Sequence, residues 1–178
     1  MKSFLKKFMV LSLGLTFIAA GCSKDDDEDV VAGLNGNYTA TIEAKIDNAT
    51  VYPVAQLGDP ATLPFKVENA KGTEFTIAGT IALNANLPVV GGANINIALN
   101  ATGAQITKED LLGVPIYAGS FTIPAQEIAF SGLQIPIQAS TGTVALNVIT
   151  FSVQGSVPAM QSGAPAQTVT IDVSMARQ

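Results

Sequence analysis

Hydrophobic and polar residues alternate along most of this chain. In residues 36–46, GNYTATIEAKI, the side chains from Tyr38 to Ile46 are apolar at every second position and Thr, Glu or Lys between. A period of two is typical of a half-buried β-strand. Residues 73–87, TEFTIAGTIALNANL, repeat the pattern, with Gly79 on the inward set, where a strand bends or another chain approaches closely.

The same alternation predicts strands along the rest of the chain. After the turn PVVGGA, residues 94–101 form the second arm of a hairpin with 73–87. In a strand, odd- and even-numbered residues point to opposite faces, and we call the choice of face the parity of a residue. The apolar residues change parity at Ala118–Phe121 and at Val148–Ile149, which predicts a β-bulge at each position. Residues 107–113, TKEDLLG, are the only helix candidate, with Thr107 as its cap and Gly113 as its end. Further strands are predicted over 114–123, 126–131, 133–138, 143–153 and 167–175.

These elements predict an all-β fold of eight to ten antiparallel strands. A closed barrel and a two-sheet β-sandwich both produce this alternation. The long strands and the predicted bulges favour a barrel-like meander. Five phenylalanines mostly occupy inward positions, which indicates core packing rather than a binding box: Phe65, Phe75, Phe121, Phe130 and Phe151.

The amino terminus has the pattern of a secretory signal peptide. Lys2, Lys6 and Lys7 are followed by residues 8–20, which are apolar apart from one Ser and one Thr. A positive segment, a short apolar segment and a small-residue exit define such signals. The apolar stretch is too short for a membrane-spanning helix, which needs about 20 residues. We expect residues 1–21 to be removed.

Cys22, the only cysteine of the chain, follows Ala19, Ala20 and Gly21. This arrangement resembles the lipobox of bacterial lipoproteins, although Ala19 occupies the position where that family most often has Leu. The resemblance implies that Cys22 becomes the acylated first residue and anchors the protein to the outer membrane. The alternative is an ordinary signal peptide followed by a free thiol. No second cysteine is present to form a disulfide.

A run of like charge follows Cys22 directly. Such a run stays solvated and does not fold, so residues 22–33 are predicted to form a disordered tether before a single domain at 34–178. An acidic run after the lipidated Cys, with a Lys near its start, also resembles the surface-export signal of Bacteroides lipoproteins. That resemblance implies display on the cell surface, and the alternative is the periplasmic face. The run consists of Ser23, Lys24, Asp25, Asp26, Asp27, Glu28 and Asp29.

A second resemblance covers roughly 34–178. The opening LNGNYTATIEA contains Leu34, Gly36, Tyr38 and Thr39 in a Leu-x-Gly-x-Tyr-Thr pattern, and the chain closes with the amphipathic TVTIDVSMARQ. Both are similar to the boundaries of calycin-like lipoprotein domains of the same bacteria. The resemblance implies a barrel related to lipocalins and leaves the ligand open.

The composition disfavours most chemistry. The chain has no His and no Trp, and its formal net charge is −5. Nucleophilic catalysis normally needs an activating base, and zinc or copper needs His or Cys ligands. We therefore expect no enzyme activity, metal or cofactor, and without a basic patch no nucleic acid partner. Carboxylates available for glycoside hydrolysis are Glu43, Glu74, Glu109 and Glu127, of which Glu43 and Glu74 have solvent-facing parity.

Two functions remain. The first is a lipid-anchored binding module that holds a small apolar ligand in its barrel or at the mouth, which requires an unfilled cavity. The second is an adhesive or structural surface domain that binds glycan or protein through an exposed sheet face rich in Thr and Asn. Charge inserted at Thr76, Thr80 or Asn84 tests that face.

Overall fold

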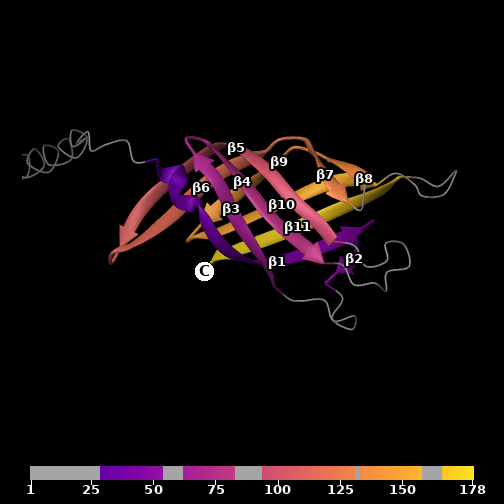
Figure 1. Cartoon of the computed structure of the whole chain (residues 1–178), viewed down its shortest axis with the longest axis horizontal. Coiled ribbons are helices and arrows are strands. Elements are labelled where there is room, and N and C mark those ends of the chain that lie inside the picture. The colour runs from indigo at the N-terminus through magenta and orange to yellow at the C-terminus, as the bar shows by residue number, and fades with distance from the viewer. Residues whose placement is uncertain (1–28, 54–61, 83–93, 131–132, 158–165) are drawn as a thin grey trace, which may run out of the picture.

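The computed structural model describes residues 29–53, 62–82, 94–130, 133–157 and 166–178. These residues form an antiparallel all-β fold, as predicted, preceded by one short 3-10 helix (Figure 1). The elements are η1 (Val30–Leu34), β1 (Gly36–Ile46), β2 (Ala49–Tyr52), β3 (Leu63–Lys71), β4 (Glu74–Ala82), β5 (Asn94–Leu111), β6 (Val114–Ile123), β7 (Gln126–Phe130), β8 (Leu133–Ile137), β9 (Ser140–Ala145), β10 (Val148–Val157) and β11 (Gln167–Arg177).

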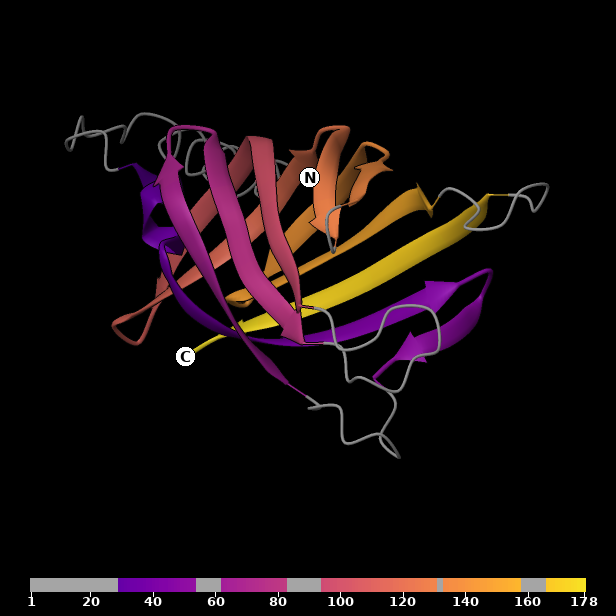
Figure 2. The same cartoon turned by 45° about the vertical axis from the view of Figure 1, so that its right-hand side comes forward.

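The sheet closes on itself, which decides between the barrel and the sandwich. Eight strands follow one another around the barrel in the order β1–β3–β4–β5–β6–β9–β10–β11. β11 pairs with β10 on one side and with β1 on the other, and this second pairing completes the ring. β2 pairs only with β1 and extends beside the ring (Figure 2). Closure leaves no free edge along the main barrel wall.

β7 and β8 continue β6 and β9 rather than forming a separate layer. Ile123 pairs with Ser140, and Gln126 pairs with Ile137, so the register is unbroken across the gap in each strand. β7 also reaches β5, and β8 reaches β10, in each case through one residue pair. The chain therefore forms an up-and-down meander of the kind that favours a barrel.

The helix predicted at 107–113 is wrong. β5 runs to Leu111, and Thr107, Glu109 and Asp110 pair with residues of β6. The Thr107 hydroxyl donates to the carbonyl oxygen of Ala118 at 3.1 Å instead of capping a helix. A helix of one or two turns is marginal because nucleation is unfavourable, and a neighbouring strand offers the same backbone a full set of hydrogen bonds.

The two predicted bulges are also wrong. Tyr117, Phe121 and Ile123 share one inward parity, while Ala118 is exposed. The switch in inward positions before Ile149 results from a turn rather than a bulge. The predicted strand 143–153 is two strands, β9 and β10, joined by a turn at 146–147. Register shifts occur instead on β1 between Ala44 and Lys45, on β3 between Glu68 and Lys71, and on β5 between Thr102 and Gln105, opposite Ser120–Thr122 of β6.

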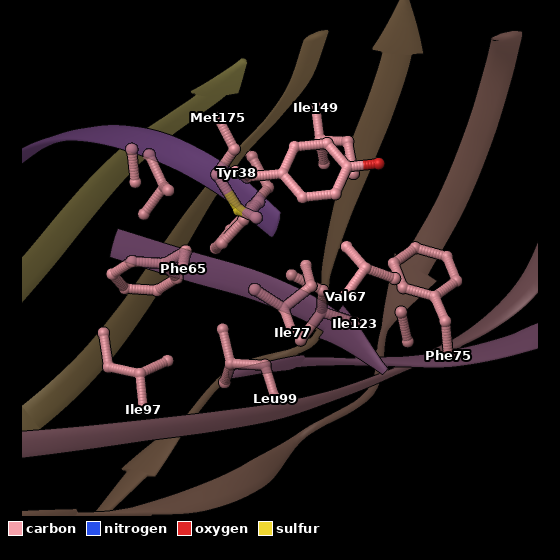
Figure 3. Close-up of a cluster of buried hydrophobic side chains, with 14 of the residues drawn as sticks. Tyr38, Phe65, Val67, Phe75, Ile77, Ile97, Leu99, Ile123, Ile149 and Met175 are labelled. Carbon is pink, nitrogen blue, oxygen red and sulfur yellow. The ribbon is translucent and has the colours of Figure 1, made fainter. Parts of the chain in front are cut away.

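Side chains of the predicted inward set line the barrel interior and pack against one another (Figure 3). Phe75 and Phe121 pack edge to face with ring centroids 4.9 Å apart, and Phe121 contacts Phe151 in the same way at 6.5 Å. Of the described side chains classed as buried, none is polar or charged apart from the tyrosines. The Tyr38 hydroxyl donates to the carbonyl oxygen of Leu34 at 2.8 Å, and burial raises the pKa of this phenol.

One end of the barrel carries η1, and this end is called the η1 end below. Val31 and Leu34 are buried against the barrel core. The Arg177 guanidinium donates to the carbonyl oxygens of Gly33 at 2.7 Å and Asn35 at 3.0 Å. The structure thus places residues 29–33 with the domain, before the predicted boundary at 34.

Candidate functional site

The predicted anchor, Cys22, and residues 23–28 of the predicted export signal lie outside the described residues. Asp29, the last residue of that run, has a structural role. Its carboxylate accepts hydrogen bonds from the backbone N–H of Ala32 at 3.2 Å and of Gly72 at 2.6 Å. These bonds cap η1 and attach the start of the domain to the turn between β3 and β4.

An open depression of about 460 Å³ lies on the outside of the barrel, across β1, β9, β10 and β11. We call it the outer polar depression. Its exposed side chains are mainly hydroxyls and carboxylates, and the buried Phe151 and Val173 contribute to its lining. The lining residues are Thr41, Glu43, Thr141, Thr143, Thr150, Phe151, Asp172, Val173 and Ser174.

The strand register places hydroxyls in a row across this surface. Thr41 pairs with Ser174, Ser174 with Thr150, and Thr150 with Thr143. Ser120 of β6 pairs with Thr143 and continues the row. All five side chains are exposed, and the Oγ1 atoms of Thr143 and Thr150 are 2.9 Å apart. We call these residues the hydroxyl row.

An ion-pair cluster lies beside the hydroxyl row. Glu43 and Asp172 are cross-strand neighbours on β1 and β11. Lys45 Nζ lies 2.9 Å from Glu43 Oε2 and 3.2 Å from Asp172 Oδ2. The Thr50 hydroxyl donates to Glu43 Oε1 at 2.9 Å. One ammonium group therefore faces two carboxylates, and the cluster keeps a net negative charge.

The hydrogen bonds of this cluster shift its titration. The hydrogen bond from Lys45, followed by that from Thr50, lowers the pKa of Glu43, and the hydrogen bond from Glu43 chiefly raises the pKa of Lys45. For Asp172 the hydrogen bond with Ser152 is the largest cause of a lowered pKa, and Lys45 adds to it. Both carboxylates are therefore ionised at neutral pH.

The sheet face that was predicted from the sequence lies on β4 and β5, and its polar groups are paired with one another. The Thr80 hydroxyl donates to Asn96 Oδ1 at 3.0 Å, and that of Thr76 donates to Asn100 Oδ1 at 3.4 Å. Gln126 exchanges two hydrogen bonds with the backbone of Asn100, each at 3.1 Å. Asn84 lies outside the described residues. The Thr76 and Thr80 hydroxyls are thus both engaged by asparagine side chains.

The barrel interior holds one orphaned polar atom among the described residues. Ser140 Oγ is buried and has no hydrogen-bond partner in the protein. Ser140 begins β9 opposite the buried Ile123 and has the inward parity of Val144. An unpaired buried hydroxyl costs about 1–3 kcal/mol, so this position favours a further hydrogen-bond partner.

The remaining candidate carboxylates do not form a site. Glu74, Glu109 and Glu127 are exposed on three different strands, β4, β5 and β7. The described part of the chain contains no group of three or more acidic, His or Cys side chains placed to hold a metal ion. Glu43 of β1, in contrast, is a cross-strand neighbour of Asp172 on β11.

The sequence patterns did not reveal the hydroxyl row or the role of Asp172. Parity placed Thr41 and Glu43 of β1 on the solvent face, but parity within one strand does not give the register of its neighbours. The ion pair between Lys45 and Asp172 joins residues that are 127 positions apart in the chain. Only the closure of β11 against β1 brings them into contact.

The arrangement defines the protein as a closed antiparallel β-barrel with a polar depression on its outer wall. A scan of protein families, a search of curated proteins and a search of solved structures all found no match to this chain. Within the described ranges, none of the helical residues form a stretch with the length and apolar character needed to cross a membrane.

Proposed function

We propose that this protein is a lipid-anchored β-barrel of the bacterial cell surface that binds glycan in its outer polar depression without catalysing a reaction. The hydroxyl row beside Glu43 and Asp172 is the observation that carries this proposal. Sugars are polyhydroxylated, so they exchange hydrogen bonds with hydroxyls and donate charge-assisted bonds to carboxylates. Threonine loses little conformational freedom on binding because its χ1 angle is already restricted.

The state of the two carboxylates supports binding rather than hydrolysis. Glycoside hydrolases need one carboxyl group that stays protonated, with a raised pKa, to act as the general acid. The pKa values of Glu43 and Asp172 are both lowered. Both groups then act as hydrogen-bond acceptors for a sugar, and neither serves as a proton donor.

The glycan proposal is tested by screening the full chain against a panel of soluble polysaccharides. In the best binder, the double variant Thr143→Val/Thr150→Val removes two hydroxyls and keeps the β-branched shape. Each lost hydrogen bond of about 1 kcal/mol should weaken binding roughly fivefold. The matched control is Thr80→Val on the β4 face. If Thr80→Val weakens binding and the double variant does not, the site lies on β4 and β5. A panel without any binder contradicts the glycan class.

Anchoring and display rest on the sequence of residues 1–29 and have their own test. We expect an acyl modification on Cys22, seen by mass spectrometry of the amino-terminal peptide, and its loss in Cys22→Ser. Protease treatment of intact cells should degrade the barrel of the wild-type protein. Complete protection in intact cells, with degradation after lysis, would place the protein on the periplasmic face instead.

A second candidate is a small, mostly apolar ligand inside the barrel, with a polar group that pairs with Ser140. The unpartnered Ser140 Oγ and the apolar surroundings favour it. Native mass spectrometry of the purified full chain would show an extra mass that disappears on denaturation. Ser140→Ala should abolish the extra mass while leaving the empty barrel at least as stable, because it removes an unpaired hydroxyl. A bare mass in the wild-type protein contradicts this candidate.

A further inference from the structure

The most exposed large hydrophobic side chains of the described residues lie at two turns at the same end of the barrel. Leu112 is 98% exposed, Leu146 76%, Leu111 61% and Val114 57%. Three of them, Leu111, Leu112 and Val114, lie at the turn between β5 and β6. Leu146 lies at the turn between β9 and β10. We call these four residues the apolar tips. Clustered exposed apolar side chains mark an interaction site, whereas scattered ones need no explanation.

Hydrogen bonds hold the two turns together. The Asn147 side chain accepts a bond from the backbone N–H of Tyr117 at 2.8 Å and donates to the carbonyl oxygen of Pro115 at 3.0 Å. Asn147 follows Leu146, and Pro115 follows Val114, so the β9–β10 turn is fastened to β6 just below the tip of the β5–β6 hairpin. Both turns lie at the η1 end, where the β5–β6 hairpin projects past the other strands (Figures 1 and 2).

The backbone at these turns indicates that the leucines do not serve folding. Leu112 has φ 54° and is followed by Gly113 at φ 83°, and Leu146 has φ 50° and is followed by Asn147 at φ 65°. Two consecutive positive φ values are typical of a type I′ turn, whose first position favours Asn, Asp or Gly. The turn at the opposite end of β1 has Asp47 at that position, with φ 48°. Leu112 and Leu146 are therefore both exposed leucines in a disfavoured backbone conformation.

The chain before the barrel identifies the occupant of this patch. Asp29 lies at the η1 end, and it follows Cys22 by seven residues. Seven residues span at most about 25 Å when fully extended. If Cys22 carries acyl chains, the η1 end is thus held close to the lipid surface. Glu109 and Asp110 precede the leucines, which favours a neutral lipid surface over an anionic one.

We infer that the apolar tips insert into the interface of a neutral lipid bilayer and fix the orientation of the anchored barrel. This inference rests on the proposed acylation of Cys22. Leucines at the level of the lipid headgroups gain apolar burial, and a second membrane contact beside the anchor strengthens attachment. The outer polar depression on the barrel wall then keeps a constant orientation relative to the membrane.

Because the chain contains no Trp, a single introduced Trp reports its own surroundings. The full chain, purified with its acyl modification, is reconstituted into phosphatidylcholine vesicles as Leu112→Trp, as Leu146→Trp and as the control Ala98→Trp. Ala98 is exposed near the start of β5, far along the strand from the β5–β6 turn. For Leu112→Trp and Leu146→Trp we expect a blue shift of the Trp emission and quenching by lipids brominated in their acyl chains. For Ala98→Trp we expect neither effect.

The outcomes separate the inference from the proposed function. Acylated protein whose tip tryptophans emit as in water would overturn the inference and leave the anchor intact. A blue shift that depends on protein concentration and is insensitive to brominated lipid would show that the tips pack against a second copy, which also overturns it. An amino-terminal peptide without acyl mass would overturn both, because nothing would then hold the η1 end at the membrane.

Discussion

The Phe65 ring lies directly over Gly79, its cross-strand partner on β4. A Cβ atom added to Gly79 would lie 2.5 Å from carbons of that ring, closer than real contacts allow. Gly142 and Phe121 repeat the relationship on β9 and β6. An aromatic ring that covers a neighbouring glycine fills the space where a side chain is missing and fixes the register of the pair. Two such pairs are found inside the barrel.

This relationship predicts a strong coupling between Phe65 and Gly79. Gly79→Ala should destabilise the fold by about 1–3 kcal/mol because the ring must shift. Phe65→Ala alone should cost about 3–5 kcal/mol. The double variant should cost less than the sum, because the methyl group then enters space that the ring has left. Urea unfolding of the four proteins measures the coupling, and additive losses would contradict the packing described here.

Asp29 gives a second prediction. Asp29→Ala removes the cap of η1 and the bond to Gly72, and should lower the free energy of unfolding by about 1 kcal/mol. Asp29→Asn keeps an oxygen acceptor and should lose much less. Chemical denaturation of the three proteins compares them. An equal loss in both variants would indicate that charge, rather than the hydrogen bonds, matters at this position.

The ion-pair cluster predicts a pH dependence. The folded state lowers the pKa of Glu43 and of Asp172, so it binds protons less readily than the unfolded chain. The resulting stability is fully present above the ordinary carboxyl pKa of about 4, and it is lost as the pH falls through the lowered pKa values of the folded state. Lys45→Met removes a shared cause of both shifts. Its thermal midpoint should therefore fall less steeply with acid than that of the wild-type protein.

Lys71→Met is the control for the pH prediction. Lys71 is exposed at the end of β3, so this substitution removes the same charge at a site away from the ion-pair cluster. Midpoints recorded across the acid range for the three proteins give the slopes. The difference between Lys45→Met and wild type should shrink in high salt, since the three side chains are partly exposed to solvent. A slope changed equally by both substitutions would attribute the effect to net charge alone.

Alternation along the chain was sufficient to predict the fold class and most of the inward residues. Tyr38, Ile77 and Leu99 are buried as expected, because one face of each strand must leave water. The strand pattern failed at Leu146, where a turn separates two strands that were predicted as one. It also did not predict that β5 continues past residue 101 through the register shift beside Gly103, which has φ 62°.

The outer polar depression could not be predicted from patterns along the sequence, for a different reason. Its residues come from the first strand and the last three elements of the barrel, so their proximity depends on ring closure. Nothing local in the sequence fixes the offset between β1 and β11, which decides that Thr41 meets Ser174 rather than a neighbour two residues away. Likewise, the sequence pattern predicts a short helix at Leu111 and Leu112, because the hairpin that displays them depends on pairing between β5 and β6.

The last prediction concerns Leu112. In Leu112→Asn, the β5–β6 turn becomes Asn-Gly, the preferred pair for a type I′ turn, so the barrel should gain up to about 1 kcal/mol of stability. The control is Leu111→Asn, at a neighbouring exposed position that ends β5, where Asn lowers β-propensity and should not stabilise. Thermal unfolding of the three proteins in solution gives the comparison. A loss of stability in Leu112→Asn would mean that this leucine supports the fold, and its exposure would then need a different explanation from contact with lipid.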